Sequence, residues 1–182
     1  SNPVDIIAHY IYKLSGLPKN QVIGTGTAID SARLQNMIAQ TVNVDPRSVH
    51  AYSMGEHGDS QMVPWSTVTI AGKPFYDVIA DNKELVGDVD LDEPVYRTTQ
   101  EGWEIFNRKG TTYYGIATAC VGVIKAILND ENRIIPVSTL LEGEYGERDV
   151  YAGVPTVLNR SGAYDVIEIH MTPGELARFK ES

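Results

Sequence analysis

The sequence predicts an α+β fold in which long helices and antiparallel strands occupy separate stretches of the chain. Apolar residues recur at helical spacing in the first 42 residues and again from about 98 to 128. After Asp130 they alternate as in strands, and turns that contain glycine separate the runs. With 182 residues, 42% of them hydrophobic, the chain can bury the core of one domain, or of one domain with a fragment of another.

The first predicted helix begins after Asn2, which we expect to cap it, with Pro3 at the first helical position. Asp5 then lies near the positive end of the helix dipole. Gly16 ends the helix. Its apolar face consists of Val4, Ile7, Ala8 and Ile11.

Residues 21–24 predict a short strand, followed by a turn at 25–27 and a helix over 29–42. A dinucleotide-binding turn has three spaced glycines between a strand and a helix. The run Gly24-Thr25-Gly26-Thr27-Ala28-Ile29 resembles such a turn but lacks the third glycine. Ile29 stands in its place and would hold the helix away from the strand. A tight turn is therefore favoured over a phosphate site.

The middle of the chain predicts extended segments at 50–52 and 62–70 around the polar loop 55–60. The acidic stretch 81–93 has no periodicity, and we expect a solvated loop there.

Two helices should follow, and the first, over 98–108, carries Trp103 and Phe106 on one face. The second covers 113–128 and has Lys125 as its only charge, so we expect it to be buried.

The last third of the chain predicts an antiparallel meander with one wet face. Apolar and polar residues alternate in its strands, which are expected at 133–141, 150–158 and 166–171. Thr172 and Glu175 then form a capping box that starts a terminal helix.

Composition excludes two classes of partner. A net charge of −9 repels nucleic acid and anionic membranes, and no segment has the roughly 20 apolar residues of a membrane span. The single cysteine, Cys120, and the lack of a visible signal peptide favour a cytoplasmic protein. An acidic protein that binds an anion needs a local positive site, so individual arginines and histidines become candidates.

Asp30, Arg33 and His57 form the best candidate constellation. Asp30 and Arg33 share a helix face, although a carboxylate complementing the dipole and an exposed arginine are the favoured explanation when the pair is taken alone. His57 lies in a loop between two glycines, where a histidine is also often an ordinary surface residue.

Together the three residues fit the oxidation of a 2-hydroxy acid. That reaction needs a base for the hydroxyl proton, a planar cation for the carboxylate and a hydride acceptor. His57, Arg33 and a nicotinamide would supply these, while Asp30 would fix the imidazole tautomer.

The chain resembles the L-lactate dehydrogenase family over essentially its whole length. Seven of its motifs match motifs of that family and occur in the same order. They are residues 2–5, 13–18, 22–27, 29–33, 55–60, 109–116 and 129–132. The resemblance implies a substrate-binding catalytic domain at 25–182. Residues 1–24 would be the last helix and strand of a dinucleotide-binding domain.

The resemblance assigns the catalytic roles. His57 matches the family's proton donor and acceptor, Asp30 its partner, and Arg33 the clamp on the substrate carboxylate. It implies no metal.

The resemblance also implies NAD as cofactor, a small 2-hydroxy or 2-oxo acid as substrate, and a homo-oligomer, either a dimer or a tetramer. Asn2 matches the asparagine near substrate and nicotinamide, and Thr112 matches a threonine of the substrate pocket wall. Ile116 matches the apolar residue against the nicotinamide ring.

The family's glycine-rich phosphate loop, its ribose-binding acid and its mobile loop with a second arginine are not found in this sequence. We therefore expect a C-terminal part of an enzyme, inactive when isolated.

Lactate and pyruvate are the favoured substrates, with three alternatives left open. L-2-hydroxyisocaproate dehydrogenases share the GTGT turn, the Asp-x-Ala-Arg helix and a glutamine at the position of Gln35. The isolated chain could also be a non-catalytic assembly module. A metal hydrolase using His57, Asp59 and Asp30 is disfavoured, because no second histidine stands at ligand spacing.

His50 is a possible effector residue. Bacterial family members activated by fructose 1,6-bisphosphate resemble one another in a histidine at this position and an arginine at position 35, where this chain has Gln35. One positive charge per subunit is lost, so we expect little activation at neutral pH, with any residual effect growing as His50 protonates.

Overall fold

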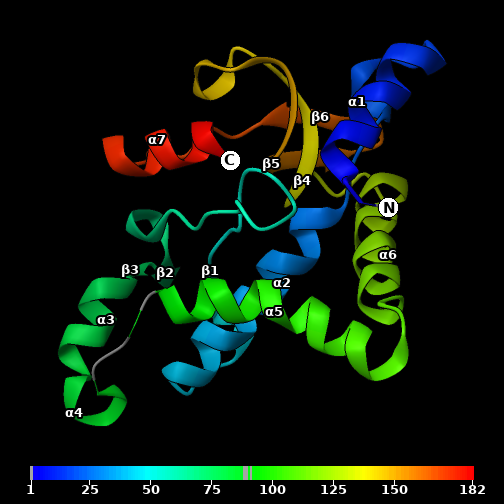
Figure 1. The fold of residues 1–182 in the computed structure, drawn as a ribbon. Coiled ribbons are helices and arrows are strands. Elements are labelled where there is room, and N and C mark those ends of the chain that lie inside the picture. Colours follow the sequence, from blue (N-terminus) through cyan, green and yellow to red (C-terminus); the bar gives the residue numbers. More distant parts are fainter. Residues whose placement is uncertain (1, 88–89, 91) are drawn as a thin grey trace.

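The computed structural model describes residues 2–87, 90 and 92–182, and Figure 1 shows helices arranged around two small antiparallel sheets. The helices are α1 (Val4–Ser15), α2 (Gly26–Thr41), α3 (Phe75–Asp81), α4 (Lys83–Val86), α5 (Asp92–Lys109), α6 (Tyr114–Leu128) and α7 (Pro173–Glu181). The strands are β1 (Val49–His50), β2 (Thr69–Ile70), β3 (Lys73–Pro74), β4 (Arg133–Glu142), β5 (Arg148–Asn159) and β6 (Gly162–Val166). The α+β class is confirmed.

Strands β4, β5 and β6 form the predicted antiparallel meander. The expected position of the third strand is wrong, because 167–171 forms no strand and bonds back through the Ile167 amide to the Pro155 carbonyl. Gly162 has φ 98°, so the chain reverses directly after Asn159 and pairing resumes at once. The capping box and the terminal helix are present as predicted.

Helix α1 packs against β4 and β5 and ends, as predicted, at Gly16 in the left-handed conformation. Pro3 occupies the cap position with no side-chain cap, so the cap predicted at Asn2 is wrong and that residue is exposed. The inner face of α1 is anchored through Ala8, which belongs to a buried cluster with Val22, Leu140 and Tyr151. Its outer face, including Leu14, is exposed.

The strand predicted at 21–24 is also wrong. The chain forms a 3-10 turn there and a single antiparallel bridge, in which Gly24 and Ser138 exchange backbone hydrogen bonds of 2.9 and 2.8 Å. Helix α2 then begins at Gly26, earlier than predicted, and buries Leu34 and Ile38 completely.

The second sheet, β1–β2–β3, borders a core in which Trp65 stacks on Phe75 with ring centroids 5.7 Å apart. A 3-10 turn at Trp65–Thr67 interrupts the segment predicted as extended. The loop expected at 81–93 is wrong in part, because α4 and the start of α5 are helical; residues 88, 89 and 91 lie outside the described residues.

Helix α5 ends just before Gly110, where φ is 75°, and α6 begins at Tyr114. Trp103 and Phe106 lie on one face of α5, as predicted, and their rings pack edge to face with centroids 6.1 Å apart. The burial predicted for the second helix is wrong, because α6 buries only the side with Val123 and Ala126 and exposes the opposite apolar side. Of the helices within 2–87, 90 and 92–182, none combines the length and apolar character of a membrane crossing.

Candidate active site

The loop 55–60, drawn in teal at the centre of Figure 1, is fixed on β5. Gly55 exchanges backbone hydrogen bonds of 3.0 and 2.8 Å with Gly153. Its φ is 85°, a conformation that strains residues other than glycine, and a Cβ there would also displace the Ser182 hydroxyl, whose oxygen would lie 1.9 Å away. This anchoring holds the loop, and with it His57, beside α2.

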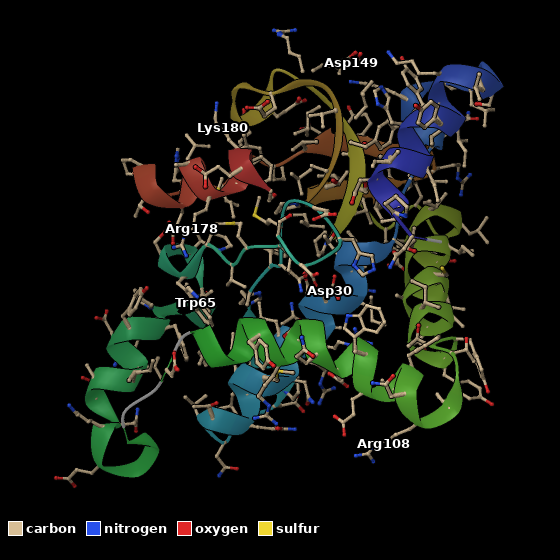
Figure 2. All side chains as sticks on the ribbon, in the orientation of Figure 1. Asp30, Trp65, Arg108, Asp149, Arg178 and Lys180 are labelled. Atoms are coloured by element: carbon tan, nitrogen blue, oxygen red, sulfur yellow. The ribbon has the colours of Figure 1, made fainter. Side chains whose placement is uncertain are left out.

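His57 and Asp30 form the central contact of the site. The imidazole Nδ1 lies 2.6 Å from Asp30 Oδ2, and their side chains are 22% and 4% exposed. Figure 2 shows Asp30 near the centre of the molecule, on α2 below the loop. An ionised carboxylate only accepts hydrogen bonds, so Nδ1 carries the proton and Nε2 is left to exchange a proton with a ligand.

A glycine at the start of α2 makes room for this histidine. A Cβ on Gly26 would lie 2.2 Å from the His57 ring, so any side chain there would displace the imidazole. The other glycine of the turn is packed as closely, since a Cβ on Gly24 would lie 2.8 Å from the Ser138 Cβ. Close packing against His57 and Ser138 therefore explains both glycines of this turn.

The surroundings of His57 favour its protonated form. Burial lowers the pKa of the imidazole, but the hydrogen bond and the charge of Asp30, together with the charge of Asp5, outweigh burial and the opposing charge of Arg33. The pKa of His57 is therefore raised above its ordinary value.

Arg33 lies on the same face of α2 as Asp30, between α2 and α5. Its Nη1 is 3.6 Å from Asp30 Oδ1, and its Nε is 3.6 Å from Glu101 Oε2. Both distances exceed those of good hydrogen bonds, so the guanidinium keeps donors for a further partner. Next to it Gly102 contributes no side chain, and a Cβ there would only reach contact distance, 3.6 Å from Nη1.

A buried hydrogen-bond network ties α2 to the segment that leads into the loop. The Ser53 amide donates to Ser31 Oγ at 2.8 Å, and the Ser53 hydroxyl donates to Gln61 Oε1 at 2.7 Å. Since Ser31 follows Asp30 directly, this network sets the distance between the carboxylate and the loop.

Sequence reasoning missed two charged neighbours of the site, Asp5 and Glu101. The His57 main-chain amide donates to Asp5 Oδ2 at 2.9 Å, and Glu101 approaches Arg33 from α5. Both contacts join residues far apart in the chain, so the spacing of neighbouring residues in the sequence does not predict them. The one available signal was that Asp5 stands inside the first of the seven motifs.

The other predicted site residues lie outside this cluster. Asn2 is exposed before α1, Thr112 is exposed between α5 and α6, and Ile116 is half-buried in the first turn of α6. That turn lies close to α2, since a Cβ on Gly115 would be 2.7 Å from Ile29 Cδ1. Within the described part of the chain, no hydrogen bond or ion pair joins these three residues to the cluster around His57.

The remaining predictions concern the possible effector residue His50 and a metal site. His50 is exposed on β1. In the residues that the structure describes, no group of three His, Cys, Asp or Glu side chains could hold a metal ion, so the hydrolase alternative has no ligand set there.

Comparison with known proteins gives one family and many relatives. Residues 27–182 match the family model of the lactate/malate dehydrogenase, alpha/beta C-terminal domain. The whole chain is 53% identical to L-lactate dehydrogenase 3 of Bacillus cereus and 49% identical to L-lactate dehydrogenase 1 of Bifidobacterium longum. It spans 58% of the length of either relative.

Solved structures of lactate dehydrogenases share the fold of this chain. The chain superposes over its full length on MGS-M5, a lactate dehydrogenase from a Medee basin deep-sea metagenome library, with a TM-score of 0.95 at 43% identity. Against the minor L-lactate dehydrogenase from Enterococcus mundtii in its ligands-bound form the TM-score is 0.93 at 42% identity. It covers 58% and 57% of these two chains.

Proposed function

This chain belongs to the lactate/malate dehydrogenase family, and from that premise we propose that it is the catalytic part of an NAD-dependent oxidoreductase that interconverts L-lactate and pyruvate. The observation that carries the proposal is the 2.6 Å contact between His57 and buried Asp30, with Arg33 on the same helix face. The names of the relatives support lactate as substrate. A homo-oligomer in the cytoplasm belongs to the same proposal.

In this mechanism Arg33 binds the substrate carboxylate through its planar guanidinium and thereby fixes the orientation of the substrate's reacting carbon in the site. His57 Nε2 donates a proton to the keto oxygen in reduction and removes the hydroxyl proton in oxidation. Asp30 stabilises the imidazolium and holds its tautomer. The nicotinamide of NAD, when bound, supplies or accepts the hydride.

Two described residues are our candidates for contacts with the nicotinamide end of that cofactor. Half-buried Ile116 offers an apolar contact, and exposed Asn2 offers an amide at the start of α1. Because the glycines of the turn 24–27 serve to pack against His57 and Ser138, we place the phosphates at a different site. We assign that site to a dinucleotide-binding domain, of which residues 1–24 are the last segment, and the catalytic domain to 25–182.

The test uses the complete protein, meaning this chain together with its dinucleotide-binding domain. We expect oxidation of NADH, followed by absorbance, to form L-lactate from pyruvate, and to be slower with the branched 4-methyl-2-oxopentanoate and with oxaloacetate. A preference for the branched acid would favour the hydroxyisocaproate alternative. Lack of turnover with every 2-oxo acid would refute the proposal.

The chain of 182 residues alone should neither bind NADH tightly nor reduce pyruvate. Positioning of the cofactor makes a large contribution to the rate, and we assign the site for its phosphates to the dinucleotide-binding domain. Fluorescence titration with NADH and a turnover assay check this, with the complete protein as control. Turnover by the isolated chain would contradict the assignment of its domains.

Fructose 1,6-bisphosphate should activate the complete protein little or not at all at about pH 7. The Gln35 side chain carries no charge. It already donates a hydrogen bond to the carbonyl of Ala51, the residue after His50, at 2.9 Å. Steady-state assays across pH, with and without the bisphosphate, measure the effect. Strong activation at neutral pH would show that other residues build an effector site.

A further inference from the structure

We propose that Asp5 is a positioning residue of the active site, whose carboxylate holds the main-chain amide of His57 and thereby fixes the catalytic loop to α1. The catalytic consequence rests on the proposed function. The effect on the imidazole itself does not, and it can be measured separately.

The contact joins two distant parts of the sequence. Asp5 lies in the first turn of α1, and its Oδ2 accepts from the His57 amide at 2.9 Å. Figure 1 shows the start of α1, in dark blue, beside the teal loop. Asp5 thus links the segment assigned to the dinucleotide-binding domain with the residue that exchanges the proton.

A role in helix stability alone explains this arrangement poorly. A carboxylate that complements the dipole of α1 could remain in water, whereas Asp5 is only 8% exposed. Its second oxygen, Oδ1, is buried and has no hydrogen-bond partner among the described residues. A buried carboxylate with incomplete hydrogen bonding costs folding free energy, so its placement under the catalytic loop points to function.

Asp5 also contributes to the charge balance at the imidazole. The charged groups around His57 are Asp5 from α1, Asp30 and Arg33 from α2, Glu101 from α5 through Arg33, and Glu56 and Asp59 from the loop itself. Burial lowers the pKa of His57, while Asp30 and then Asp5 raise it and Arg33 lowers it. Removing the charge of Asp5 should therefore lower the pKa of His57.

The first experiment compares Asp5→Asn with wild type in the complete protein. Asparagine keeps an oxygen that can accept from the His57 amide but carries no charge. The rate at which diethylpyrocarbonate modifies His57, followed by mass spectrometry of its peptide across pH, reports the pKa of the imidazole without any activity. The matched control is Asp149→Asn, which removes an exposed carboxylate that also contacts α1, through Lys13 at 2.6 Å.

We expect a lower pKa of His57 in Asp5→Asn and an unchanged pKa in Asp149→Asn. An unchanged pKa in a folded Asp5→Asn protein would overturn the electrostatic part of the proposal.

The second experiment separates positioning from charge. Asp5→Ala removes the acceptor as well, so the loop loses its link to α1 and kcat should fall by about 10²-fold, with a smaller change in KM. Asp5→Asn should retain most of kcat and move the pH profiles of reduction and oxidation together toward lower pH. A lower melting temperature in both variants, with unchanged kcat and unchanged profiles, would mean that Asp5 is merely structural. A wild type without dehydrogenase activity would refute the proposed function, while the modification rates would still decide the role of Asp5.

Discussion

Replacing His57 by alanine in the complete protein should lower kcat for pyruvate reduction by about 10²- to 10⁴-fold, because no other described side chain at the site offers a neutral-range proton donor. In free energy this is a loss of about 3 to 5 kcal/mol of transition-state stabilisation. Affinity for NADH should change little, since the contacts of His57 are with Asp30 and Asp5 rather than with a cofactor surface. Steady-state kinetics and NADH titration measure both quantities.

The control for this variant is His170→Ala, the same substitution at an exposed position away from the cluster. Near-normal turnover by His57→Ala would assign proton transfer to another group.

The pH dependence of the wild-type rates tests whether His57 is the acid in reduction and the base in oxidation. Reduction needs the imidazolium, so its rate should fall as pH rises through the raised pKa of His57, and oxidation should rise over the same range. Profiles of the opposite sense would exclude His57 as the acid and base.

Arg33→Lys should give the second large effect, a loss of roughly 10- to 10²-fold in kcat/KM, with KM raised and kcat lowered. Lysine keeps the charge but cannot make the two parallel hydrogen bonds that a carboxylate accepts from a guanidinium. The substrate must also compete with Glu101 for this group, so a weaker and less directional cation is at a further disadvantage. Michaelis–Menten kinetics with pyruvate measure both parameters.

Arg47→Lys is the matched control, because that arginine pairs with Asp45 while its side chain is 91% exposed. It should leave kcat and KM unchanged. If Arg33→Lys behaved like this control, the substrate carboxylate would have to be bound by a different cation.

The parts of the fold that follow from local chemistry were predictable. The glycine that ends α1, the alternation along β4 and β5, and the box of Thr172 and Glu175 each depend on residues close in sequence. The errors arise where distant contacts decide. The segment 21–24 gains only one bridge to β4, and α6 leaves an apolar side uncovered in the described residues, a fact that no count of its apolar positions could reveal.

The site divides in the same way. The shared helix face of Asp30 and Arg33 follows from their spacing, and the glycines around His57 mark a loop. That the loop folds onto this face depends on the bridge between Gly55 and Gly153, which joins residues nearly one hundred positions apart. The contacts of Asp5 and Glu101 were hidden for the same reason.

The most direct test of the central claim is a crystal structure of the complete protein with NADH and oxamate, a non-reactive analogue of pyruvate. The account predicts that the guanidinium of Arg33 binds the oxamate carboxylate through two hydrogen bonds, and that His57 Nε2 lies within hydrogen-bond distance of the oxygen that corresponds to the keto group. Oxamate bound away from both side chains, with Arg33 still held between Asp30 and Glu101, would contradict it.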